Sequence, residues 1–249
     1  MIRKEKEGVH WLEFELFQDI PGMVHAVFLR HGGYSKGQFA SFNLSYHLGD
    51  DREYVKANLD KAKRLLGIER FFWGNQVHGA KVETVDRQMK HIPECDGLAT
   101  KSTSMGLMIH HADCQAAIFC DPVERVIAAA HSGWRGSVAN IYSNLIAHMQ
   151  KTSGSKSENL LVGISPSLGP QSAQFINYKT ELPEFFWQYQ VKPLYFDFWA
   201  ISKQQLIDCG ISPHHIEIAG IDTMSCPEDY YSYRYAKVRG GHGTVVAWT

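Results

Sequence analysis

Hydrophobic and polar residues alternate near the start of the chain. Leu12, Phe14 and Leu16 are separated by glutamates, which is the period-two pattern of a strand with one buried face. A turn over residues 19–22 leads into a second apolar run at 24–30. Together the two runs predict a β-hairpin.

The pattern changes to helical spacing after residue 50. Asp50 and Asp51 are favourable N-cap residues, and Gly67 is a favourable helix stop. The apolar residues between them recur every three or four positions: Val55, Leu59, Ala62, Leu65 and Leu66. We predict a helix that packs its apolar face on the core.

Short apolar runs with the length of strands fill the middle of the chain. They lie at five places: 81–85, 106–111, 116–120, 126–130 and 160–164. Residues 121–125 have the length of a hairpin loop, so the third and fourth of these runs are predicted to pair.

Helical patterns and one further hairpin complete the predicted elements. Helices are predicted from Val138 onward and from a cap at Asp197 through Cys209. Residues 231–235 and 244–248 are predicted to pair as a final hairpin. No repeat or long linker divides the chain, so one α/β domain spanning all 249 residues, 1–249, is predicted.

Charge narrows the classes of function. The chain has 25 lysines and arginines against 26 aspartates and glutamates, a net charge of −1. Proteins that bind nucleic acid or membrane surfaces electrostatically usually carry a basic excess, so we expect neither partner. The N-terminal residues lack an apolar signal region, and no apolar run approaches the roughly 20 residues of a membrane span. A cytoplasmic location is therefore expected.

Cysteine and histidine supply the candidate chemistry. If Cys120 faces Val126 across the predicted hairpin, Cys114 lies opposite Ser132 and diagonal to His131. A thiol and an imidazole then meet at the open end of the hairpin. A cysteine at the start of a strand is, however, more often a packing residue than a reactive one.

Arg135 follows His131 in a glycine-containing segment, and a predicted helix begins just after it. The unpaired N–H groups and the dipole at the start of a helix favour an anion, so this segment is a candidate anion cradle. The plainer interpretation is a turn that carries a solvated arginine.

His78 is a third candidate, next to Gly79 and before the predicted strand at 81–85. The spacing from His78 to Cys114 and His131 is too wide for a zinc finger, so only the fold can bring the three together. If it does, two imidazoles and one thiolate leave a fourth tetrahedral position for water, which is the arrangement of catalytic zinc.

Eight short motifs occur along the chain in this order: Arg30-His31-Gly32-Gly33, Ser41-Phe42-Asn43-Leu44, His47-Leu48-Gly49-Asp50-Asp51, Gln76-Val77-His78-Gly79, Asp96-Gly97-Leu98, Ala112-Asp113-Cys114, Ala130-His131-Ser132-Gly133-Trp134-Arg135-Gly136 and Ser232-Tyr233-Arg234. With these motifs the sequence resembles the YfiH-like laccase-domain family, also called the multicopper polyphenol oxidase-like or purine nucleoside phosphorylase family. The resemblance runs from about residue 24 to the C-terminus. It implies a single-domain α/β fold, a layered sandwich with mixed β-sheets flanked by helices.

The resemblance also implies a site and an activity. By motif position the zinc ligands and catalytic residues fall on His78, Cys114 and His131, and Arg30 and Asn43 fall in the substrate pocket. The implied activity is zinc-dependent phosphorolysis of adenosine, inosine, guanosine and methylthioadenosine, with adenosine deamination in addition. A purine nucleoside and phosphate are then the partners, and we expect Arg135 to contact the phosphate.

The chain departs from the family pattern at three places. The usual pair of cysteines after a Gly-Pro segment is replaced by Gln171 and Ser172, the usual His-Ala-Gly-Trp has Ser132, and the usual double arginine is reduced to Arg234 and Tyr235. No zinc ligand is lost. We expect these changes to affect the pocket wall and the substrate range.

Four other interpretations stay open at this stage. Cys114 and His131 alone would suit a metal-free cysteine hydrolase. Members of the family are also described as copper-dependent polyphenol oxidases, for which Met105 or Met108 would be the axial ligand, and as peptidoglycan editing factors. A structural zinc would need a fourth protein ligand, with these candidates: His110, His111 and Cys226. Asp113 suits a proton acceptor, a partner of a histidine or a structural carboxylate.

Overall fold

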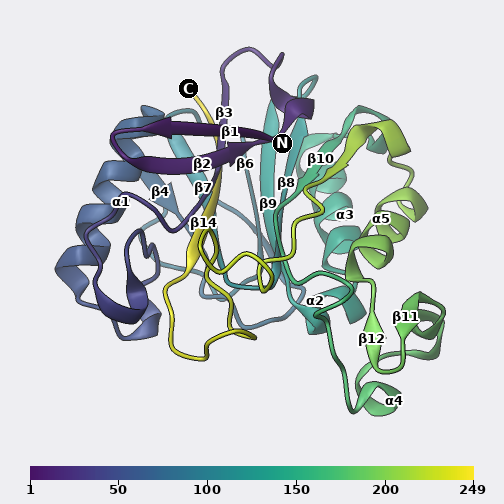
Figure 1. The fold of residues 1–249 in the computed structure, drawn as a ribbon. Helices are drawn as coiled ribbons and strands as arrows, with labels where there is room; N and C mark the ends of the chain where they lie inside the picture. The colour runs from purple at the N-terminus through teal and green to yellow at the C-terminus, as the bar shows by residue number, and fades with distance from the viewer.

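The computed structural model describes all residues, 1–249, and arranges them in four layers (Figure 1). Two six-stranded sheets face each other in the middle, helix α1 covers the outer face of one sheet, and helices α3 and α5 cover the outer face of the other. Each sheet contains both parallel and antiparallel pairs. The predicted fold class, an α/β layered sandwich with mixed sheets, is confirmed.

The first sheet has the strand order β1-β2-β3-β14-β7-β4. Its strands are β1 (Ile2–Lys6), β2 (Val9–Glu13), β3 (Met23–Phe28), β14 (His242–Trp248), β7 (Met105–His111) and β4 (Arg70–Phe72). The second sheet has the order β13-β10-β8-β9-β6-β5. Its strands are β13 (Ile216–Ile218), β10 (Leu161–Ile164), β8 (Gln115–Asp121), β9 (Val126–Ser132), β6 (Gly97–Thr100) and β5 (Val82–Thr84).

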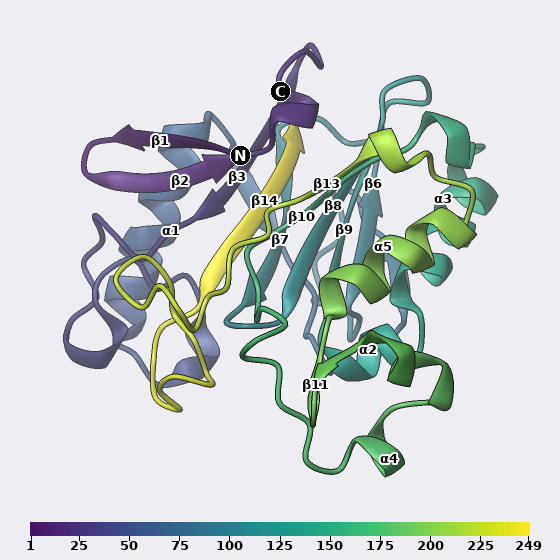
Figure 2. The same ribbon diagram turned by 45° about the vertical axis from the view of Figure 1, so that its right-hand side comes forward.

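The remaining elements are helices and one small ribbon. The helices are α1 (Arg52–Leu66), α2 (Trp134–Val138), α3 (Ile141–Ser153), α4 (Tyr178–Glu181) and α5 (Phe198–Asp208). Six short 3-10 turns lie at Glu15–Phe17, Gly37–Phe39, Tyr46–Leu48, Ser157–Asn159, Glu184–Tyr189 and Pro213–His215. The ribbon of β11 (Gln190–Lys192) and β12 (Tyr195–Phe196) projects with α4 beyond the end of the second sheet (Figure 2). None of the helices is both long and apolar enough to cross a lipid bilayer.

Apolar side chains fill the space between the sheets and under each helix layer. Leu107 and Ile109 of β7 meet Ile118 and Ile127 of the second sheet in the central core, and all four are at most 1% exposed. Full burial of one such side chain contributes roughly 1.5–3 kcal/mol. Because strands β7, β8 and β9 are covered on both faces, their near-continuous apolar sequence follows from their position.

Local capping signals determine helix α1 as predicted. The Asp51 side chain accepts a hydrogen bond from the Glu53 N–H at the start of the helix, and Gly67 ends it in the left-handed conformation, with a φ of 68°. The helix at 198–208 likewise begins after its predicted cap, Asp197. Both boundaries follow from residues within a few positions of the helix end.

The first and the last of the three predicted hairpins need correction in the extent or pairing of their strands. The first strand ends at Glu13 rather than continuing to residue 16, because the Phe14 N–H donates to Nε2 of His25 instead of continuing the ladder. Residues 231–235 form no strand. Strand β14 pairs instead with β3 and β7 in the middle of the first sheet, so both of its edges are already occupied.

Candidate active site

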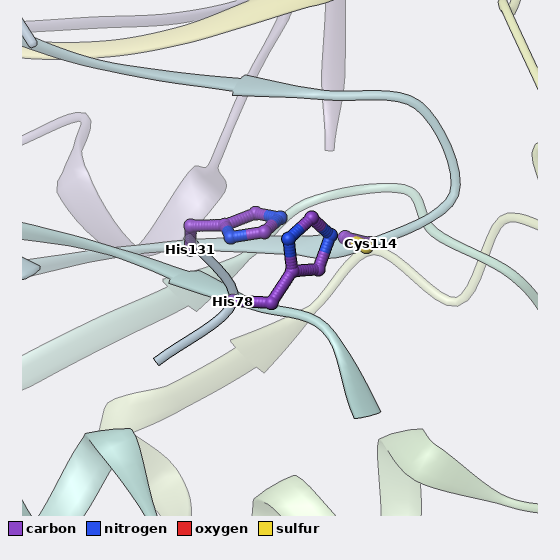
Figure 3. Close-up of side chains that lie close together, drawn as sticks. All are labelled: His78, Cys114 and His131. Carbon is purple, nitrogen blue, oxygen red and sulfur yellow. The ribbon is translucent and has the colours of Figure 1, made fainter. Parts of the chain in front are cut away.

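The side chains of His78, Cys114 and His131 lie close together (Figure 3). His78 lies in the connection between β4 and β5, Cys114 lies in the turn that carries the chain from β7 to β8, and His131 is on β9. Their donor atoms all lie within 4.8 Å of one another, and this is the only group of its kind in the chain. The fold therefore unites the three residues that were predicted from widely separated motifs.

The Cys114 sulfur lies in an electropositive environment. Burial raises the pKa of Cys114, but the charge and hydrogen bonds of His131 and His78 outweigh it and lower the pKa below the usual thiol value. Burial also lowers the pKa of His131, but the Cys114 thiolate and the hydrogen bond to Asp96 raise it overall. The site therefore favours a thiolate, which is the form of cysteine that binds metals and attacks substrates.

Asp96 is a functional candidate to which the motifs assigned no role. Its Oδ1 lies 2.8 Å from Nδ1 of His131, so Nε2 is the ring nitrogen left free for the site. The same carboxylate accepts hydrogen bonds from the N–H groups of Val77, His78 and Gly79 at 2.8–3.1 Å. One buried side chain thus orients His131 and fixes the loop that carries His78. The pairing of β6 with β9 reveals this role, because just beyond the paired residues the His131 N–H donates to the Asp96 carbonyl at 2.7 Å.

The backbone approaches two of the donors, His78 and Cys114, closely. A Cβ atom on Gly133 would lie 2.9 Å from Cδ2 of His78, which is too close for a real side chain, and 3.2 Å from Sγ of Cys114, which is tighter than an ordinary contact. His78 itself has a φ of 61°, an uncommon conformation for a residue with a side chain. The loop around Asp96 holds His78 in this conformation and directs its ring to the site.

Two cavities adjoin the donor group. The larger one, of about 620 Å³, is lined in part by aromatic side chains: Trp134, Phe175, Phe198 and Tyr233. The smaller one, of about 400 Å³, is lined mostly by polar residues that include Gln76, His110 and His111. Four residues line both cavities: His78, Ala112, Cys114 and Arg239. His131 lines the smaller one, so the two cavities meet at His78 and Cys114.

Three arginines line the cavities: Arg135, Arg234 and Arg239. Arg135 is exposed, lines the larger cavity and stacks on Trp134 with its Cζ 4.3 Å from the ring centroid. Arg234 also lines the larger cavity, but its guanidinium donates to the carbonyls of Ser172 and Gln174. Those carbonyls belong to the segment in which the family cysteines are replaced. That segment also contributes Ala173 and Gln174 to the cavity wall.

Arg30 and Asn43 line neither cavity. The Arg30 guanidinium donates to the carbonyls of Ala40 and Pro227 and stacks on Tyr231. Asn43 is fully buried, and its amide oxygen accepts from the Gly241 N–H at 2.9 Å. Both residues brace loops near the site. Their contact with a substrate stays a prediction.

The central hairpin is shifted by one residue from the predicted register. Asp121 pairs with Val126, and Cys120 pairs with Ile127. The reason is that Asp121 still belongs to the strand and closes the loop by accepting hydrogen bonds from the N–H groups of Val123 and Glu124. Cys114 consequently lies just before β8, in the turn, where its side chain is free to reach both histidines.

Asp113 has a structural set of contacts. Its two oxygens accept hydrogen bonds from the Thr223 hydroxyl and the Arg234 N–H, each at 2.7 Å. These bonds hold the C-terminal loop against the turn that carries Cys114. Of the three roles considered for this residue, the contacts support the structural carboxylate.

The other candidate ligands do not join the donor group. Met105 and Met108 are buried in the apolar cores on the two sides of the first sheet, and neither lines a cavity. His110 and His111 line the smaller cavity outside the group of three. Burial lowers the pKa of His110 to about 4, so this imidazole is neutral. Cys226 packs beside the central core. The group consequently consists of two imidazoles and one thiol, with no fourth protein donor.

Fold and donor set together define a class: an α/β double-sheet sandwich with a His-His-Cys group between two cavities. Residues 24–249 match the family model described as multi-copper polyphenol oxidoreductase laccase. The chain therefore belongs to this laccase-domain family, and the predicted membership is confirmed.

Similar proteins cover nearly the whole chain. It is 28% identical to the purine nucleoside phosphorylase YlmD of Geobacillus stearothermophilus over 91% of this chain and 89% of that protein. It is likewise 28% identical to a purine nucleoside phosphorylase of Xylella fastidiosa, over 92% and 93%. The crystal structure of the Geobacillus stearothermophilus YlmD superimposes with a TM-score of 0.87 at 25% identity, over 98% and 97% of the two chains. That of Bacillus licheniformis YfiH gives 0.89 at 18% identity, over 99% of each chain, and supports the fold alone.

Proposed function

We propose that this protein is a zinc-dependent purine nucleoside phosphorylase. The observation that carries the proposal is the convergence of His78, Cys114 and His131 where the two cavities meet. The names of the relatives, which are similar over 89% and 93% of their length, support the reaction type. The proposed substrates are a purine nucleoside and inorganic phosphate.

The donor set fits zinc. A thiolate and two neutral imidazoles are typical zinc ligands, and three protein ligands are the number found in catalytic sites. His78, Cys114 and His131 would hold the ion, and Asp96 would fix the ring of His131 in the orientation that presents Nε2. When bound, zinc supplies a positive charge that attracts an anionic substrate and acts as a Lewis acid. Copper lacks an axial methionine here, because Met105 and Met108 are in the core.

The larger cavity suits the nucleoside. Trp134 and Phe175 meet edge to face with ring centroids 6.2 Å apart, and Phe198 lies 5.1 Å from Phe175, so flat aromatic surfaces line one wall. A purine ring binds such surfaces by stacking. The Arg135 guanidinium has no hydrogen bond or ion pair within the protein, which leaves it free to contact a polar group of the substrate. A volume of about 620 Å³ is within the usual range of small-molecule sites.

The proposed substrate range is adenosine, inosine, guanosine and methylthioadenosine, with adenosine deamination as a second activity of the same site. Aromatic stacking recognises the face of a purine and is indifferent to the group at its six-position, which supports a broad range. The proposed location of the enzyme is the cytoplasm.

Metal analysis and a product assay test the proposal. We expect one equivalent of zinc, and no stoichiometric copper, in the wild-type protein, with ribose 1-phosphate released from inosine and phosphate. Cys114→Ala removes a ligand and is expected to lose both zinc and activity, whereas Cys209→Ala, which changes a thiol on the far side of the second sheet, is expected to retain both. Full activity in a metal-free Cys114→Ala protein would contradict the proposal.

A metal-free cysteine hydrolase is a second candidate, favoured by one observation. The Asp96 carboxylate contacts the His131 imidazole, and His131 contacts the Cys114 thiol. This is the arrangement of a thiol nucleophile with its base and the carboxylate that orients the base. His78 has no role in that mechanism, although it contacts the same sulfur. Chelator treatment separates the two candidates: loss of activity on metal removal supports the phosphorylase, and amidase activity that survives it supports the hydrolase.

A further inference from the structure

The two cavities differ in chemical character although they share two of the three donors, His78 and Cys114. The larger cavity carries the aromatic side chains, whereas the smaller one is lined by side chains that include Ser45, His47, Gln76 and His110. His78, Cys114 and Arg239 line both. A ligand in one cavity and a ligand in the other would therefore meet at His78 and Cys114.

Arg239 is the one strong cation of the smaller cavity. It is half-buried, and it forms no ion pair with any carboxylate of the chain. One terminal nitrogen donates to the Lys237 carbonyl at 3.1 Å, while the Nε atom is buried without a partner. The guanidinium stacks on Tyr233, with its Cζ 4.8 Å from the ring centroid, which fixes its plane. An oriented guanidinium with a buried free donor suits an oxyanion.

His110 adds a second unsatisfied group to the same cavity. Its Nε2 atom is buried and has no hydrogen-bond partner. Gln76 does not satisfy it, because both polar atoms of the Gln76 side chain bond to the backbone of His110. A buried polar atom without a partner is costly unless a ligand or water satisfies it. Hydrogen phosphate carries both an O–H donor and several acceptor oxygens, so it matches Arg239 and His110 together.

The chemistry of phosphorolysis explains why two cavities are needed. A phosphate oxygen forms a bond to C1′ of the ribose while the bond from C1′ to N9 of the purine breaks. The electron pair of that bond passes to N9, and the proton of hydrogen phosphate ends on the purine. Attack opposite the leaving group places phosphate and purine on opposite faces of the ribose. Two cavities of different chemical character therefore suit two substrates, whereas a reaction of one substrate would need only one of them.

We propose that the smaller cavity is the phosphate site, with Arg239 as its principal ligand, and that the purine occupies the larger cavity. This inference rests on the proposed phosphorylase function and assigns the second substrate within it. It differs from the expectation that Arg135 holds the phosphate. Arg135 stands in the larger cavity, outside the smaller one, and Arg234 is occupied by the Ser172 and Gln174 carbonyls.

Calorimetric titration of inorganic phosphate into the metal-loaded protein, without nucleoside, tests the site directly. We expect Arg239→Gln to weaken phosphate binding about tenfold or more, because a charge-assisted contact is lost. Arg239→Lys keeps the charge and is expected to lose less. Lys237→Gln removes an exposed charge from the same loop and is the matched control, expected to leave phosphate affinity unchanged. Equal phosphate affinity in wild type and Arg239→Gln would overturn the proposal.

Kinetics then separate the two substrates. With inosine saturating, Arg239→Gln is expected to raise the KM for phosphate about tenfold or more, while the KM for inosine changes by less than about threefold. Arg135→Gln is expected to act mainly on the KM for inosine, and the reverse assignment of the two arginines would contradict the inference. If phosphate binding depends on Arg239 but the protein has no phosphorylase activity, the proposed function is wrong and the anion site is correct. If phosphorolysis persists unchanged in Arg239→Gln, the anion site is wrong and the proposed function is correct.

Discussion

The Asp96 carboxylate and the His131 imidazole form a buried pair, with Oδ1 2.8 Å from Nδ1. The same carboxylate accepts three N–H groups from the loop that carries His78, so one side chain positions two of the three donors. Burial raises the pKa of Asp96, but the hydrogen bonds from His131 and from this loop lower it overall, which keeps the carboxylate ionised. Asp96 is therefore a positioning residue for His131 and for the loop that carries His78.

Asp96→Asn is expected to weaken zinc binding roughly 10–100-fold, the usual effect of losing a partner that orients a ligand. The asparagine keeps the shape but offers an acceptor on only one side, so either His131 or the loop loses its bond. Competition with a chromophoric chelator measures the affinity. Asp60→Asn, on the exposed face of α1, is the control. Unchanged zinc affinity in Asp96→Asn would contradict the role.

Gly133→Ala is expected to impair the donor set without unfolding the chain. The backbone angles at this glycine, φ −76° and ψ 175°, suit any residue, but the new Cβ would collide with the His78 ring and crowd the Cys114 sulfur. We expect a loss of zinc affinity of roughly tenfold or more, comparable to the loss of an orienting contact.

The control for this glycine is Gly154→Ala. Gly154 has a φ of 76° and free space around it, so alanine is expected to cost about 1–2 kcal/mol of stability while zinc binding stays intact. Thermal melts and chelator competition on both proteins separate the two effects. Normal zinc affinity in Gly133→Ala would show that the donors lie farther from the backbone than described.

Phe175→Ala is expected to raise the KM for inosine about tenfold, because stacking of a base on an aromatic ring is worth about 1–3 kcal/mol. The KM for phosphate is expected to change little. Phe185→Ala removes a ring that is 62% exposed and lines neither cavity, and it is the matched control. Steady-state kinetics with each substrate varied in turn give the two constants. A larger effect on phosphate than on inosine would contradict the placement of the purine.

Acid is expected to destabilise the folded protein through its buried neutral histidines. Burial lowers the pKa of His25 to about 4, and its Nε2 accepts from the Phe14 N–H at 2.7 Å. Burial likewise lowers the pKa of His242 to about 4, where Nε2 accepts from the Tyr231 N–H. In the unfolded chain these imidazoles take up protons near the ordinary pKa of about 6.5. The unfolded state therefore binds more protons, and the free energy of unfolding falls as the pH drops from about 6.5 toward 4.

The expected loss is about 1.4 kcal/mol per such histidine at one pH unit below 6.5. Urea unfolding at a series of pH values between 8 and 5 measures it. His25→Gln keeps an acceptor for the Phe14 N–H but cannot titrate, so the pH dependence is expected to decrease by about one proton. An unchanged slope in this variant would show that His25 is already protonated in the folded state.

Local sequence determined the ends of the capped helices, the positions of the buried strands and the identity of the three donors. Helix α1 begins and ends where Asp51 and Gly67 place it, because a cap acts within one turn of the helix. The buried strands follow from their apolar runs, and the motifs on which the family membership rests contain all three donors. These features can be predicted without knowing which strands are neighbours in the sheets.

Tertiary structure alone decided the strand order, the register and the residues that surround the donors. The place of β14 between β3 and β7, the shift of the central hairpin by one residue and the pairing of β6 with β9 depend on contacts between segments far apart in the chain. Apolar runs of similar composition are compatible with several partners, so the pattern of one strand does not select its neighbour. Only the β6–β9 pairing brings Asp96 to His131, and only the packing of the C-terminal loop brings Arg239 to both cavities.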